Sequence, residues 1–144
     1  MAAILLKSAR AARAAPSREA AGFAIGGVRW VLRLEGLAAF AAAVALYAHA
    51  GFSWWIFAAL ILAPDLAMLG YLAGPRAGAA AYNLVHTYAL ALPLALAGFF
   101  LSAPAASAVG LILVAHIGMD RALGYGLKYA AAFGDTHLGR IGRR

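Results

Sequence analysis

The sequence predicts an all-α integral membrane protein, an antiparallel four-helix bundle. Of its 144 residues, 65% are hydrophobic and 12% are charged, whereas a soluble domain is nearer half apolar and a quarter charged. Four apolar stretches of roughly 20 residues follow one another, each long enough at about 1.5 Å per residue to cross a bilayer core of about 30 Å. The connections between them are short, so consecutive helices are expected to be antiparallel neighbours.

The turns between the apolar stretches divide the chain into elements. Glycine, proline and serine mark the turns, and they place the spans at about residues 30–50, 54–73, 79–101 and 104–125. Residues 1–27 are a separate basic tail with one acid, 28–128 the membrane domain, and 129–144 a second basic tail. The first tail also has the composition of an organellar transit peptide, but a basic tail lying on an anionic leaflet is the simpler interpretation.

The basic residues predict the orientation of the bundle. All twelve Lys and Arg residues precede or open the first span, lie between spans two and three, or lie at and after the end of span four. The positive-inside rule puts this side, with both termini, in the cytoplasm of a bacterial inner membrane. The net charge of +7 is then explained by contact with anionic membrane lipids. Lipids are therefore the expected partners, and nucleic acid is not. The absence of cysteine excludes disulfide and iron–sulfur chemistry.

Several polar side chains lie inside the spans, where an unpaired charge costs roughly 2.5–3.5 kcal/mol. Counting from the span ends places them in one layer of the inner half: Glu35, Asp65, Asn83, His86, His116, Asp120 and Arg121. His116 and Asp120 are four residues apart and share one helix face. These groups are expected to face the bundle interior, where they neutralise each other, bind a cation or line water.

Imidazole and carboxylate ligands suit zinc or manganese. The predicted ligands of such a divalent ion are Asp65, His86, His116 and Asp120. A metal ion of this kind lowers the pKa of bound water to about 7 and so makes a nucleophile. The candidate catalytic residues for proton transfer are Glu35, Asp135 and His137. The candidates for binding an anionic substrate are Arg121, Lys128, Asn83 and Tyr125.

The same residues allow two other interpretations. In a structural membrane subunit, they would form an interhelical network with Asp65 or Asp120 salt-bridged to Arg33 or Arg121. In a small ion-coupled transporter or channel, these residues would form a relay that passes protons or ions across the membrane. A ridge of small residues on the last span permits close packing, either within the bundle or between copies in a homo-oligomer; it consists of Gly118, Ala122 and Gly126.

Several motifs resemble a bacterial family of small membrane proteins known as domain of unknown function 4260. They are Arg33–Gly36, Ala63–Tyr71, Tyr82–Tyr88, His116–Lys128 and Asp135–Ile141, and the resemblance extends over about residues 29–142. More remotely, Pro64-Asp65, His86-Thr87 and His116-x-x-x-Asp120 are similar to motifs of the membrane-bound metal-dependent hydrolases. That similarity supports a metal site, and the inner position of the polar layer with its nearby basic residues then predicts a metal-dependent hydrolase acting on an anionic or lipid substrate at the cytoplasmic leaflet. Those enzymes usually have a further histidine where this chain has Ala81.

Overall fold

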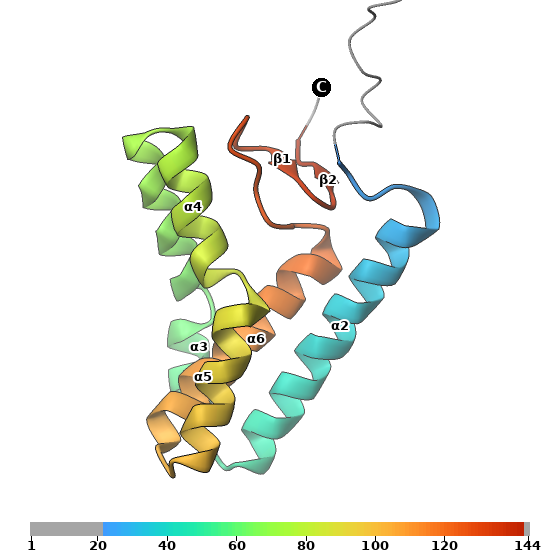
Figure 1. Cartoon of the computed structure of the whole chain (residues 1–144). Helices are drawn as coiled ribbons and strands as arrows, with labels where there is room; N and C mark the ends of the chain where they lie inside the picture. Colours follow the sequence, from blue (N-terminus) through green and yellow to red (C-terminus); the bar gives the residue numbers. More distant parts are fainter. Residues whose placement is uncertain (1–21, 143–144) are drawn as a thin grey trace, which may run out of the picture.

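The computed structural model describes residues 22–142, so most of the predicted N-terminal tail lies outside the described residues. The described chain is a set of antiparallel helices with one short hairpin (Figure 1). The elements are α2 (Gly26–His49), α3 (Trp54–Leu60), the 3-10 helix η2 (Ala63–Ala73), α4 (Pro75–Val85), α5 (Tyr88–Phe100), α6 (Pro104–Leu123), β1 (Asp135–Thr136) and β2 (Gly139–Arg140).

Four helical segments are long and apolar enough to cross a membrane, at residues 26–49, 54–73, 75–100 and 104–123. The predicted all-α fold with four spans is therefore confirmed. The third segment begins earlier than expected, because Gly74 has a φ of 108° and Pro75 takes the first helical position directly after it. Proline is well suited to that position, since its N–H would have no partner there.

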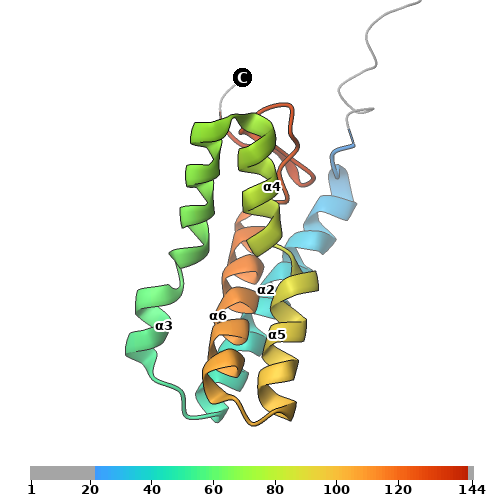
Figure 2. The same ribbon diagram turned by 60° about the vertical axis from the view of Figure 1, so that its left-hand side comes forward.

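The second and third spans are each broken near their middle (Figure 2). In the second, α3 ends at Leu60 and the chain continues as η2, where Pro64 has no N–H to continue an α-helix. A 3-10 helix rises about 2.0 Å per residue, and runs longer than about four residues are uncommon. In the third, α4 ends at Val85, and the Thr87 hydroxyl caps α5 by accepting a hydrogen bond from the Ala89 N–H at 3.2 Å. Both breaks lie beside residues of the predicted polar layer.

Helix α6 is the centre of the bundle, with α2 and α5 packed against it and α4 packed against η2. The α2–α6 contact depends on glycine. A Cβ at Gly118 would lie 2.6 Å from the backbone N of Phe40, and one at Gly36 would lie 2.9 Å from that of Ala122. The predicted small-residue ridge thus packs within one chain at Gly118 and Ala122, whereas Gly126 lies beyond α6, against His137.

The chain folds back across the end of the bundle after α6 (Figure 1). Helix α6 stops at Gly124, which is left-handed with a φ of 100°. Strand β1 then pairs antiparallel with β2, and Lys128 forms a further bridge with Thr136. Thr136 and Leu138 are fully buried. We call residues 125–141 the tail segment; it covers the end of the bundle at which the polar residues gather.

Candidate metal centre

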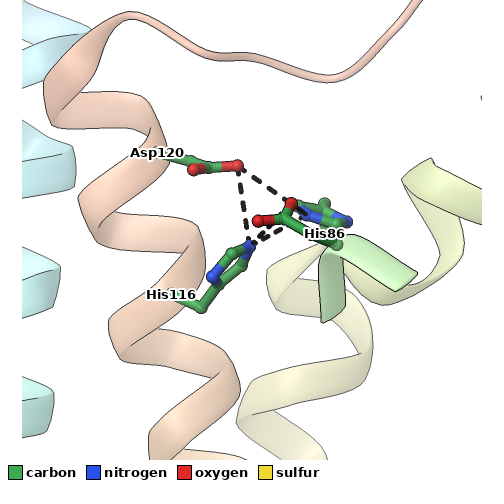
Figure 3. Close-up of side chains that lie close together, drawn as sticks. His86, His116 and Asp120 are labelled. Atoms are coloured by element: carbon green, nitrogen blue, oxygen red, sulfur yellow. Dashed lines mark hydrogen bonds and ion pairs between the residues drawn. The ribbon is translucent and has the colours of Figure 1, made fainter. Parts of the chain in front are cut away.

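The structure brings together the four residues that the sequence predicts as metal ligands. Asp65 comes from η2. His86 comes from the C-terminal end of α4, and His116 and Asp120 from successive turns of α6 (Figure 3). Each offers one ligand atom, and these four atoms all lie within 4.8 Å of one another. The two histidines are buried, and the side chain of Asp65 is the most accessible of the four at 36%. This group could therefore hold a metal ion.

The separations between the ligand atoms have the size expected around one small ion. The Nε2 atoms of His86 and His116 are 3.0 Å apart. Asp65 Oδ1 lies 3.4 Å from the first and 3.6 Å from the second, and Asp120 Oδ2 lies 3.7 Å from both. Tetrahedral ligands about 2.0–2.1 Å from a zinc ion are about 3.3 Å from one another. Distances near 3.6 Å are too long for hydrogen bonds.

The hydrogen bond of His86 fixes which of its ring nitrogens faces the group. Its Nδ1 lies 2.8 Å from the carbonyl oxygen of Tyr82. A carbonyl only accepts, so Nδ1 carries the proton and Nε2 presents a lone pair. This is the tautomer that a metal-ligating histidine adopts when a carbonyl holds its other nitrogen.

The protons available inside the group are too few for its acceptors. Two hydrogen bonds reach the ligand atoms, from the Tyr82 hydroxyl to Asp120 Oδ2 at 2.9 Å and between the Nε2 atoms of His116 and His86 at 3.0 Å, and among the described residues none reaches Asp65 Oδ1. His116 Nδ1 is buried without a hydrogen-bond partner among the described residues. Converging lone pairs in a buried place favour a cation.

Tyr82 supports the group from α4. Its hydroxyl donates a hydrogen bond of 2.9 Å to Asp120 Oδ2, and its ring stacks on that of His86 with centroids 3.6 Å apart. One residue therefore orients a carboxylate through its hydroxyl and a histidine through its carbonyl. This role of Tyr82 was not predicted from the sequence. The signal was the spacing, since Tyr82 lies one helical turn before His86 and hence on the same face.

A pocket of about 160 Å³ opens beside the two aspartates, between η2, α4 and the tail segment. Its wall includes Asp65, Asp120, Tyr125 and Lys128. Lys128 is 5% exposed, which is unusual for a lysine that forms no ion pair among the described residues. Its Nζ donates to the carbonyl oxygen of Phe133 at 3.0 Å and lies 3.7 Å from the centroid of that ring. Burial lowers the pKa of Lys128, and the charges of Asp120 and Asp65 partly offset the shift.

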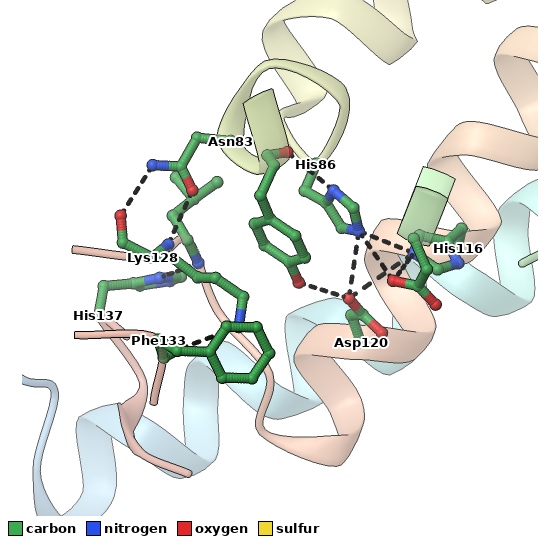
Figure 4. A network of polar contacts seen from close by, with 10 residues as sticks. Asn83, His86, His116, Asp120, Lys128, Phe133 and His137 are labelled. Atoms are coloured by element: carbon green, nitrogen blue, oxygen red, sulfur yellow. Dashed lines mark hydrogen bonds and ion pairs between the residues drawn. The ribbon is translucent and has the colours of Figure 1, made fainter. Parts of the chain in front are cut away.

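Asn83 holds the backbone of Lys128 in place (Figure 4). Its amide donates to the Lys128 carbonyl at 2.8 Å, and its oxygen accepts from the Lys128 N–H at 2.7 Å. These two hydrogen bonds attach α4 to the tail segment, because the Asn83 amide pairs with both backbone groups of Lys128 as a neighbouring β-strand would. Asn83 is therefore placed to position Lys128, and it does not line the pocket itself.

Four other predicted site residues lie outside the group of four. Glu35 is exposed on α2. The Arg121 guanidinium lies over the ring of Tyr88, 4.2 Å from its centroid. Asp135 faces Arg140 at 3.5 Å. His137 accepts a hydrogen bond at Nδ1 from the Leu127 N–H at 2.8 Å.

The expectation that all polar residues of the spans face one another is thus wrong for Glu35, which α2 turns outward because Gly36 occupies the contact with α6. The salt bridges considered for a purely structural network are also not formed. Among residues 22–142, Asp65 and Asp120 pair with histidines and not with Arg33 or Arg121. Arg33 instead donates to the carbonyl oxygen of Ala122 at 2.8 Å, near the end of α6.

Comparison with known proteins places the chain in one family. No curated protein and no solved structure matches it. The family described as Domain of unknown function (DUF4260) matches residues 29–141, which include every helix from α3 to α6 and all four residues of the candidate metal centre. The chain, with four helical segments long and apolar enough to cross a membrane, therefore belongs to the DUF4260 family.

Proposed function

We propose that this protein is a metal-dependent hydrolase of the bacterial inner membrane, acting on an anionic substrate at the cytoplasmic leaflet. One observation carries the proposal: ligand atoms of Asp65, His86, His116 and Asp120 gather within 4.8 Å of one another, beside a pocket that contains a buried lysine. Zinc suits the two imidazoles, and manganese is the second candidate. A divalent ion there would polarise a substrate oxygen and lower the pKa of a water molecule.

The residues of the chain suit hydrolysis of a phosphate ester. An ammonium group has three donors, and Lys128 uses one of them on the Phe133 carbonyl, which leaves two for an anion in the pocket. A divalent ion would neutralise the negative charges of the two aspartates. The positive charge of Lys128 would then remain available to attract an anionic substrate. In the reaction, the water oxygen bonds to phosphorus, the bond from phosphorus to the leaving oxygen breaks, and a proton of the water passes to that oxygen.

The structural and transport alternatives receive less support from the described residues. A network that only fastens helices would need hydrogen bonds between its carboxylates and imidazoles, whereas the four Asp–His contacts, at 3.4–3.7 Å, are longer than hydrogen bonds. A transport path would need polar groups through the outer half. The buried polar residues of the described chain are instead concentrated at the inner end of α6, in α4 and in the tail segment, with Ser107 the exception.

Elemental analysis of the detergent-purified full chain tests the proposal. We expect about one zinc or manganese ion per chain, and its loss in Asp65→Asn, because a ligand becomes a neutral amide. Asp135→Asn is the matched control and should keep the metal, since Asp135 lies outside the group. The metal-loaded protein is expected to hydrolyse p-nitrophenyl phosphate, and Lys128→Met should raise KM. A wild-type chain that binds neither metal after dialysis against each would overturn the proposal.

A further inference from the structure

A second pocket lies next to the candidate metal centre and is entirely apolar. It has a volume of about 160 Å³ and is lined only by aliphatic side chains and proline from α3, η2, α4 and α6. Three of its lining residues are close in sequence to three of the four predicted metal ligands. Pro64 precedes Asp65, Val85 precedes His86, and Leu113 lies one turn before His116.

The two pockets lie on opposite sides of the ligand group along α6. The apolar pocket is lined by α6 from Val109 to Leu113, in the middle of the helix. Val109 is about 10 Å from His116 along the axis. The polar pocket is lined by Asp120 and then by residues of the tail segment after the helix, including Lys128. The order from the middle of the membrane toward its inner surface is therefore apolar pocket, ligand group, buried cation.

This order matches the order of groups in a lipid of the inner leaflet, from acyl chain to anionic headgroup. We propose that the substrate is an anionic membrane lipid, with a segment of its acyl chain in the apolar pocket and its headgroup beside Lys128; this names the substrate class of the proposed hydrolase and rests on that function. A dry apolar cavity of about 150 Å³ holds a molecule the size of benzene, so the pocket takes about six carbons of a chain.

The acyl chain of the lipid can enter the apolar pocket from the lateral surface of the bundle. Val109 and Leu60 are 39% and 37% exposed on the lateral surface of the bundle, which hydrocarbon surrounds in a membrane. A bilayer lipid is the molecule present at that surface, and its acyl chain and anionic headgroup match the apolar pocket and the buried Lys128 in turn. A helix of a partner protein would fill the apolar pocket without using the polar one.

The test uses the full chain in nanodiscs that contain phosphatidic acid with a photoactivatable diazirine in one acyl chain. Crosslinks are mapped by mass spectrometry. We expect labelling concentrated on Val85, Val109 and Leu113, and a reduction of about ten-fold in Val109→Trp, equivalent to about 1.4 kcal/mol. Val31→Trp is the matched control, because Val31 is 54% exposed on α2, outside the pocket. The same probe with a phosphatidylcholine headgroup should label the pocket about ten-fold less, as expected for a lost charge-assisted contact to Lys128.

The metal content of each sample separates the two proposals. Labelling spread evenly over the exposed apolar residues, with zinc bound, would overturn the lipid substrate and leave the hydrolase standing. Two results with Val109→Trp would also overturn the lipid substrate. In the first, the variant is labelled like the wild type. In the second, the variant keeps its lipid labelling but no longer associates with a second copy of the protein. Concentrated labelling in a chain that binds no metal would keep a lipid-binding site and remove the hydrolase.

Discussion

Tyr82 is the residue on which the geometry of the candidate metal centre most depends outside the ligands. Its hydroxyl bonds Asp120 and its carbonyl bonds His86, so a ligand from α6 and a ligand from the end of α4 are oriented by one side chain and its own backbone. The Tyr82 carbonyl accepts twice, from the His86 N–H at 3.0 Å and from His86 Nδ1 at 2.8 Å, because a carbonyl oxygen has two lone pairs. The last backbone hydrogen bond of α4 and the bond that fixes the His86 ring therefore share one acceptor.

Replacing Tyr82 with phenylalanine is expected to weaken zinc binding by about 10–100-fold, the usual effect of losing a group that orients a ligand. The carbonyl bond to His86 remains, so the fold and the four ligands are kept. Competition with a zinc-binding dye measures the affinity. Tyr88→Phe is the matched control, because the Tyr88 hydroxyl is buried without a partner among the described residues. Equal affinities for the two variants would contradict this role.

The tail segment is the element that closes the polar pocket, and His137 is one of its attachments. The Leu127 N–H donates to His137 Nδ1, and the His137 N–H donates to the Leu127 carbonyl at 3.0 Å. The first bond requires Nδ1 to be unprotonated. Burial, together with the nearby Arg121 charge, lowers the pKa of His137. Protonation therefore opposes the docked position of the segment.

The docking of the tail segment is expected to weaken as pH falls below about 6.5, the ordinary pKa of histidine. The docked state has the lower pKa, so the undocked state binds more protons, and the stability present at neutral pH is lost on acidification. Hydrogen exchange at residues 127–140, corrected for its intrinsic pH dependence, should rise between about pH 7.5 and about pH 5.5.

His137→Asn provides the control for this pH effect, because its amide oxygen replaces the Nδ1 acceptor without titrating. The variant should keep the protection of residues 127–140 at both pH values. A wild-type segment whose corrected exchange does not change with pH would show that His137 titrates without affecting docking.

The sequence predicts the helices better than it predicts their breaks. Hydropathy and turn residues locate all four spans, and spacing places Asp65, His86, His116 and Asp120 in one layer. The sequence does not show that η2 is a 3-10 helix, since Pro64 predicts only a kink. It also does not show that Glu35 turns outward, because that depends on which face of α2 its neighbour Gly36 presents to α6. The fold-back of the tail segment depends on Asn83, whose two bonds reach 45 residues along the chain.

The whole molecule is polar at one end and apolar through the rest of its length. Lys128 and the tail segment lie at the end where α2 and α4 begin and α6 finishes (Figure 1), and the candidate metal centre lies between that end and the middle of the bundle, at the breaks of the second and third spans. The connections at the opposite end, around Ser53 and Ser102, carry no Lys or Arg. This asymmetry makes orientation part of the functional proposal, because it decides which side of the membrane supplies the water and receives the polar product.

The chain contains no cysteine, so single serine-to-cysteine variants report orientation without background. The positive-inside rule predicts that a membrane-impermeant maleimide labels Ser53→Cys and Ser102→Cys in intact spheroplasts. Ser8→Cys, in the basic N-terminal part, should react only after lysis. The reason is that all twelve basic residues lie on the side of the termini, and moving them across the membrane is opposed by the potential. Labelling of Ser8→Cys in intact cells would put the pocket on the outer face, and a cytoplasmic-leaflet substrate would then be excluded.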